Sequence, residues 1–127
     1  MGQDQSRDSQ SVVTKVSDYS DVTMSTWTPM DLDAFMEFNN KLYIFIETKY
    51  LDAQMPFGQQ LALERLCDMC YETGKQSFVF LTSHADHDEI DLGNSLVSKY
   101  RWKKEWHEPN SRITLHDAVL QLKEKYA

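Results

Sequence analysis

Residues 31–49 read Asp-Leu-Asp-Ala-Phe-Met-Glu-Phe-Asn-Asn-Lys-Leu-Tyr-Ile-Phe-Ile-Glu-Thr-Lys, and this stretch decides the fold. Its first part alternates in part between polar and apolar residues, as a strand with one buried face does. Its second part, 42–49, is rich in β-branched and aromatic residues, which favours a second strand. Between the two, residues 39–41 (Asn-Asn-Lys) predict a turn, because asparagine tolerates the left-handed backbone region. The stretch therefore predicts an antiparallel β-hairpin.

The length of the predicted turn decides which residues face each other. With a three-residue turn, Asp33 lies opposite Glu47, so both carboxylates stand on one face of the sheet. Lys49, two residues beyond Glu47, shares that face and lies opposite Asp31. A two-residue turn would instead put Asp33 opposite Ile46, on the other face from Glu47.

The sequence beyond the hairpin predicts two helices and two more strands. Pro56 suits the first turn of a helix, Gly74 suits its end, and Thr114 suits the N-cap of a second helix. Between the helices lie two runs that are typical of strands. The expected order is β-β-α-β-β-α, an α/β fold with a mixed sheet flanked by helices. The expected bounds are 57–73 and 114–126 for the helices, 76–82 and 96–106 for the strands, and 84–92 for an acidic loop.

The chain has 127 residues, which suits one domain. Residues 1–20 are rich in Ser, Gln and Asp and are expected to form a flexible tail before a single domain at 21–127. We see no secretory signal, and the apolar run 42–46 is far too short to cross a bilayer. Two cysteines do not make a disulfide framework. We therefore expect an intracellular, cytoplasmic protein without a membrane partner. The cytoplasm of a phage's host cell is one such location.

The net charge is −7, from 13 basic and 20 acidic residues, which argues against broad nucleic-acid affinity. A local basic track is still compatible with this charge. If residues 96–106 form one strand, Lys99, Arg101 and Lys103 lie on one face, while Lys104 lies beside Trp102 on the other. These four basic residues are the candidate contacts to a nucleic-acid backbone. The alternative is an exposed edge strand that its lysines protect from aggregation.

Two carboxylates with a lysine beside them suit a hard divalent cation. Mg²⁺ takes oxygen ligands and keeps several waters. Asp33, Glu47 and the backbone carbonyl of Thr48 would leave positions for water and a phosphate oxygen, with Asp31 as second choice for the first ligand. Lys49 would orient or help to deprotonate the attacking water, since the pKa of a lysine responds to its surroundings. Mn²⁺ is expected to substitute for Mg²⁺.

The helix after the hairpin is expected to add a glutamine to this site. Its apolar positions include Leu63, and counting back three and four residues from Leu63 gives Gln60 and Gln59. Both amides would then point toward the sheet near the end of the second strand. Gln60, or Gln59 in its place, could hydrogen-bond the water, a phosphate or Lys49.

Asp33, the hairpin after it and Glu47-Thr48-Lys49 resemble the PD-(D/E)xK nuclease superfamily, whose fold is called restriction-endonuclease-like. Residues 29–31 (Pro-Met-Asp) loosely match its leading Pro-Asp pair, and the glutamine-bearing helix also fits. The resemblance covers about residues 28–83 and points to compact phage-type or mobile-element members. It implies Mg²⁺-dependent cleavage of phosphodiester bonds, in DNA more often than in RNA.

The expected function is therefore that of a Mg²⁺-dependent endonuclease acting on nucleic acid, with DNA favoured over RNA. One alternative is a catalytically silent protein of the same fold that binds or inhibits a host enzyme, because an acidic body can mimic nucleic acid. Another is a nuclease subunit that is active only in a larger assembly. A chain of this size has little room for a separate DNA-reading domain, which favours a homodimer.

Overall fold

The computed structural model describes residues 29–51, 53–85 and 90–127. The chain divides into two units, Met1–Asp31 and Leu32–Ala127, and the sheet and both helices lie in the second. The predicted flexible tail at 1–20 lies outside the described residues. Across the described ranges, no helix is long and apolar enough to cross a membrane.

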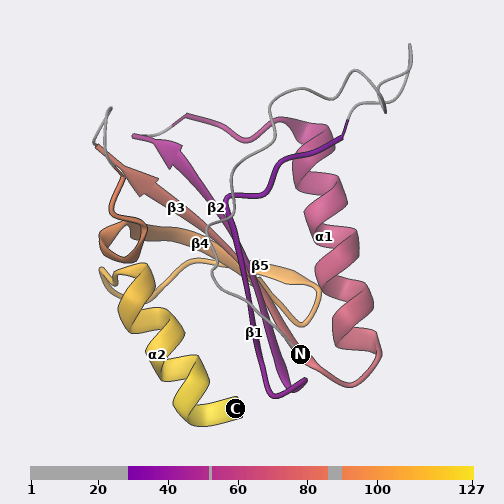
Figure 1. Ribbon diagram of the computed structural model, residues 1–127. Coiled ribbons are helices and arrows are strands. Elements are labelled where there is room, and N and C mark those ends of the chain that lie inside the picture. Colours follow the sequence, from indigo (N-terminus) through magenta and orange to yellow (C-terminus); the bar gives the residue numbers. More distant parts are fainter. Residues whose placement is uncertain (1–28, 52, 86–89) are drawn as a thin grey trace, which may run out of the picture. The chain divides into compact units, whose positions relative to one another are not determined.

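In the described ranges, five strands form one mixed sheet in the order β1-β2-β3-β4-β5, and one helix covers each face (Figure 1). β2 and β3 are parallel and are connected through α1, while the other neighbouring pairs are antiparallel. The predicted α/β class with a mixed sheet and flanking helices is confirmed. The bounds are β1 Ala34–Phe38, β2 Leu42–Tyr50, α1 Phe57–Glu72, β3 Gln76–His84, the 3₁₀ turn η1 Leu92–Asn94, β4 Leu96–Trp102, β5 Glu105–His107 and α2 Leu115–Tyr126.

The predicted strand at 96–106 is wrong, because it is a hairpin of two strands. β4 ends at Trp102, and Lys103 and Lys104 form the turn, with φ angles of 53° and 68°. β5 then returns antiparallel to β4, which makes the order β-β-α-β-β-β-α. Two-residue turns with positive φ usually carry Asn or Gly, so the Lys-Lys pair gave no sign of this one. Beyond Trp102 the alternation of the predicted strand no longer holds.

The turn between β1 and β2 has the predicted length of three residues. Phe38 pairs with Leu42, and the residues between them include Asn39 and Asn40, with φ angles of 54° and 56°. Asparagine adopts this left-handed backbone region more readily than most residues do. The register on which the candidate site depends is thus confirmed.

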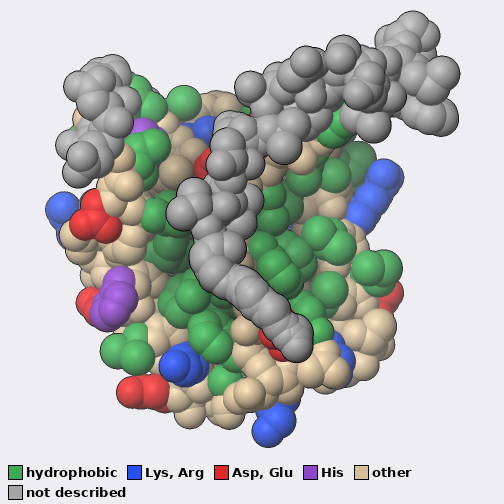
Figure 2. Space-filling view, viewed as in Figure 1, with side chains coloured by type: hydrophobic (Ala, Val, Ile, Leu, Met, Phe, Trp, Pro, Cys, Tyr) green, Lys and Arg blue, Asp and Glu red, His purple; other side chains and the backbone are tan. Residues whose placement is uncertain are grey.

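Packing on both faces of β1 holds this register. On the α1 side, Phe35 packs against the rings of Tyr43 and Phe45, with centroids 6.1 and 5.0 Å apart. On the α2 side, Met36 packs against the core. A slip of one residue would exchange the two faces. Phe35 remains 50% exposed. Figure 2, viewed as in Figure 1, shows hydrophobic side chains gathered on the side of the molecule where β1 lies.

The sheet separates two hydrophobic cores. The smaller core, under α1, contains Phe45, Leu63, Cys67 and Val79. Burial raises the pKa of the Cys67 thiol to about 11, against a smaller opposing effect of the hydrogen bond from Ser77. Cys67 is therefore a protonated core residue at neutral pH. The larger core, under α2, contains Leu42, Ile44, Ile46, Phe78, Phe80, Val97, Leu115 and Ala118.

Acidic side chains at every fourth position of α1 bind groups on the β4–β5 hairpin. This spacing places them in one row along the helix. The pairs are Glu64 with Trp106, Asp68 with Arg101, and Glu72 with Lys104. The Arg101 guanidinium donates two hydrogen bonds to Asp68, of 2.9 and 2.8 Å. These bonds, and the negative charge of Asp68, raise the pKa of Arg101. The row ties α1 to the far edge of the sheet.

The Glu64 carboxylate makes part of the stability depend on pH. The Trp106 indole, which donates a 2.7 Å bond, is the largest cause that lowers the pKa of Glu64 below 4.5, and Gln60 adds to it against the effect of burial. A pKa that is lower in the folded state stabilises the fold above pH 4.5, and this contribution is lost as the pH falls through the folded value.

We expect Trp106→Phe to weaken the acid dependence of the unfolding free energy, as measured by urea unfolding at several pH values. Glu105→Gln, at an exposed acid of β5, is the control, and parallel pH curves for wild type and Trp106→Phe would contradict the prediction.

Candidate functional site

The candidate site lies at the carboxyl end of β2, where β2 runs parallel to β3. Glu47 pairs in register with Leu81 of β3, and Lys49 pairs with Ser83. Both side chains point to the α1 side, because Phe45 of the α1-side core has the same strand parity. Glu47 is only 5% exposed. A carboxylate this deep in a protein needs charged or hydrogen-bonding partners.

Three donors from the described part of the chain meet the Glu47 carboxylate. The Asp33 backbone N–H donates to Oε1 at 3.3 Å, and the Gln59 amide donates to Oε2 at 2.7 Å. Lys49 Nζ lies 3.1 Å from the same Oε2, and its side chain is 30% exposed. The buried acid is thus joined to a lysine that reaches solvent.

Asp33 precedes β1 and stands opposite Glu47, one step beyond the pair of Ala34 with Ile46. Its Oδ2 accepts a 2.8 Å hydrogen bond from the Thr48 backbone N–H, and the residue is exposed. The two strand ends therefore exchange bonds in both directions. The exchange holds the Asp33 carboxylate at the Thr48 N–H and the Glu47 carboxylate at the Asp33 N–H.

No protein-family model, curated protein or solved structure matches the chain. The chemistry of the site therefore has to be inferred from its own side chains. Carboxylate oxygens from Asp33 and Glu47 are the hard ligands that Mg²⁺ prefers, so the residues present fit this ion. Within the described ranges, no group of three or more His, Cys, Asp or Glu side chains is placed to hold a metal. Two carboxylates and one carbonyl are a smaller set of that kind.

Gln59 reaches the site, whereas Gln60 bonds elsewhere. The Gln60 amide donates to Glu64 at 3.1 Å, four residues along the same helix. Gln59 lies four residues before Leu63, which is itself four before Cys67, and both of these are buried. The helical phase of the two buried residues therefore indicates Gln59.

Two predicted metal ligands, Asp31 and the Thr48 carbonyl, stay predictions. Asp31, the second choice for the first carboxylate, belongs to the unit Met1–Asp31 and not to the unit that holds the sheet. The carbonyl of Thr48 belongs to the residue whose backbone N–H donates to Asp33. The Thr48 backbone N–H donates to Asp33, and the Thr48 hydroxyl donates to the Thr82 carbonyl at 3.4 Å. These two bonds fix Thr48 in the strand.

The predicted faces of Lys103 and Lys104 are wrong, because the chain turns at these residues. Lys104 pairs with Glu72 of α1. Lys103 Nζ lies 4.4 Å from the centre of the Trp102 ring, which packs against the α2-side core. The four basic residues thus do not form one stripe along a strand.

Lys99 shares a row and a face with Glu47. Lys99 pairs with Leu81, which pairs with Glu47, so the three residues cross β4, β3 and β2 side by side. Two strand spacings put the backbones of Lys99 and Glu47 about 10 Å apart. Lys99 Nζ lies 4.8 Å from the centre of the Trp106 ring. Sequence spacing alone could not reveal this row, because it depends on the parallel crossover through α1.

Proposed function

We propose that the chain is a Mg²⁺-dependent nuclease that cleaves phosphodiester bonds of nucleic acid, with DNA favoured over RNA. The observation that carries the proposal is the convergence of Asp33, Glu47 and Lys49 at the end of β2, with Glu47 buried and linked to Lys49. Oxygen ligands beside a lysine are the donor set that metal-assisted phosphate chemistry needs. The resemblance of these residues to the PD-(D/E)xK superfamily, and to its restriction-endonuclease-like fold, supports the same function.

In this proposal Asp33 and Glu47, with the Thr48 carbonyl, hold the ion, and Mn²⁺ substitutes for Mg²⁺. The ion would supply positive charge against the phosphate and make the attacking water more acidic. Lys49 orients the water, takes part in its deprotonation and offsets charge that develops on the phosphate. Gln59 holds the Glu47 carboxylate in place. The sequence instead predicts that Gln60, or Gln59 in its place, bonds the water, a phosphate or Lys49.

The nucleic-acid backbone is proposed to cross the sheet from Lys49 toward Lys99, which lies in the same row and on the same face as Glu47. Lys99 and Lys103 lie over indole rings, from which a phosphate can draw them at modest cost. Arg101 and Lys104 are tied to acids of α1, so their contribution would require those pairs to open. We rank Lys99 first among the four basic residues.

A second candidate is a binding protein of the same fold without catalysis, and one observation favours it. Every partner of the Glu47 carboxylate that the structure describes is a donor from the chain itself. Such a carboxylate is already satisfied and can act as a structural link between strands. The acidic surface of a chain with net charge −7 would then mimic nucleic acid for a protein partner. A nuclease subunit that is active only with a second copy, or in a larger assembly, lies between these two candidates.

The deciding experiment is a cleavage screen on duplex, single-stranded and branched DNA and on RNA, with Mg²⁺, Mn²⁺ or EDTA. We expect metal-dependent products that Asp33→Asn and Glu47→Ala both abolish. Glu37→Gln changes an exposed acid of the same hairpin and should cleave like wild type. Inert wild-type protein on all substrates would overturn the proposal. A single stoichiometric protein partner, with no metal binding in calorimetry, would support the second candidate.

A further inference from the structure

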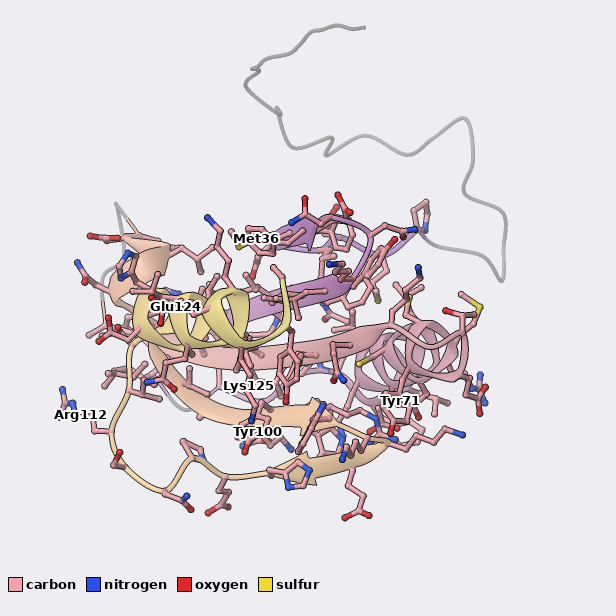
Figure 3. The ribbon with its side chains drawn as sticks, turned by 90° about the horizontal axis from the view of Figure 1, so that it is seen from below. Met36, Tyr71, Tyr100, Arg112, Glu124 and Lys125 are labelled. Carbon is pink, nitrogen blue, oxygen red and sulfur yellow. The ribbon has the colours of Figure 1, made fainter. Side chains whose placement is uncertain are left out.

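A pocket of about 380 Å³ lies on the α2 side of the sheet, on the opposite face from Glu47. Its floor comes from β3 and β4, and its walls come from α2 and from the segment between β5 and α2. Lys125 of α2 and Tyr100 of β4 both line this pocket, and the view from below shows them near each other (Figure 3). The volume is within the range of small-ligand sites.

Five aromatic side chains line this pocket. The Phe78 ring is nearly parallel to the rings of Phe80 and Trp102, at 8° and 6°, with centroids 6.1 and 5.8 Å apart. Tyr100 and Tyr126 extend this wall at 6.0 Å from Phe80 and 6.1 Å from Phe78. The two phenylalanines are buried, whereas the other three rings are half-buried. The pocket therefore offers a planar guest the three half-buried rings, which pack against the two buried phenylalanines.

The charge of the lining differs from that of the chain. The chain carries 20 acidic and 13 basic residues, yet none of the described residues that line the pocket is acidic and one, Lys125, is basic. A second ammonium, that of Lys103, lies 4.4 Å from the centre of the Trp102 ring. Asn110 and Gln121 add uncharged hydrogen-bonding groups. An anionic guest is favoured over a neutral or cationic one.

We propose that this pocket binds a mononucleotide, with the base against the aromatic wall and the phosphate near Lys125. Base–aromatic contact is tolerant of base identity, because every base has a flat face. The phosphate supplies the negative charge that the lining selects. A free nucleotide and the end of a nucleic-acid strand share this chemistry. The site does not depend on the proposed nuclease centre, since the sheet separates them.

The test is a titration of the full chain with adenosine 5′-monophosphate and with adenosine, followed by NMR of methyl groups. We expect saturable shifts at Val97 and Ile113, which line the pocket, and none at Leu63 and Val79 of the opposite core. The monophosphate should bind about tenfold more tightly than adenosine, the effect of one charge-assisted contact. No saturable shift, or shifts confined to the α1 side, would overturn the proposal.

A matched pair of variants on α2 separates the pocket from general charge. Lys125→Gln should lower the affinity for the monophosphate about tenfold, to that of adenosine. Lys123→Gln removes the same charge two residues away, outside the lining, and should bind like wild type. Equal losses in both variants, or none in either, would overturn the role of Lys125. If wild type binds, competition with a 5′-phosphorylated tetranucleotide identifies the source: displacement supports a strand end, and no displacement supports a free nucleotide.

Discussion

Replacing Lys49 by alanine is expected to lower metal-dependent cleavage by about 10²–10³-fold, the usual effect of removing one group that stabilises charge in a transition state. Lys49 Nζ is 3.1 Å from Glu47, so the change should also lower the unfolding free energy by about 2 kcal/mol. That loss is moderated because Glu47 keeps its bonds from Gln59 and from the Asp33 backbone. Single-turnover cleavage and urea unfolding measure the two effects separately.

Two further variants show how the result of Lys49→Ala should be interpreted. Lys41→Ala, at the exposed turn of the same hairpin, should keep wild-type cleavage. Lys49→Arg keeps the positive charge but cannot give up its proton at neutral pH. Near-normal cleavage by Lys49→Arg would mean that Lys49 acts through its charge, and loss of cleavage would mean that it handles a proton. Folded Lys49→Ala with full activity would remove Lys49 from the proposed mechanism.

Replacing Arg101 by alanine is expected to lower the free energy of unfolding by about 3 kcal/mol. The Arg101 side chain is only 11% exposed and donates two bonds to Asp68, so its removal leaves a partly buried carboxylate without its cation. The arginine also lies over the Trp106 ring, at 5.7 Å, and this packing is lost as well. Urea unfolding at neutral pH measures the change.

Lys104→Ala is the matched control, because Lys104 pairs with Glu72 of the same helix but is exposed. Exposed ion pairs contribute little, so this variant should unfold like wild type. Asp68→Asn together with Arg101→Ala should recover part of the stability that Arg101→Ala alone loses, since no buried charge then remains unpaired. Equal stability of Arg101→Ala and wild type would show that the pair does not hold α1 to the sheet.

The hairpin and the place of its carboxylates could be predicted from the sequence because both depend on local rules. The Asn39-Asn40 turn and the strand alternation fix the register of Asp33 against Glu47. The crossover helix was also predictable, since Pro56 precedes its first residue and Gly74 follows its end. Each of these features is set by residues that are near in the sequence.

The features that the sequence did not reveal depend on contacts between distant elements. The turn at Lys103 and Lys104 has no typical turn residue, so the sequence predicts one continuous strand through this basic run. The acids of α1 that take up Arg101 and Lys104 are spaced by four residues, but nothing local shows which strand they meet. Arg101 and Lys104 match the pattern of a phosphate track in the sequence. In the structure they form ion pairs with acids of α1.

The parallel pairing of β2 with β3 also has a kinetic consequence. Leu42 meets Gln76 only after the whole of α1 has been placed between them, whereas the β1–β2 and β4–β5 pairs close over a few residues. Short loops close fast, and long-range pairing delays folding. Early in folding, Asp33 and Glu47 can already be neighbours while Gln59 and the β3 strand are still remote. The bond from Gln59 to the buried Glu47 carboxylate then forms only with the crossover, so this end of the sheet is expected to be completed late in folding.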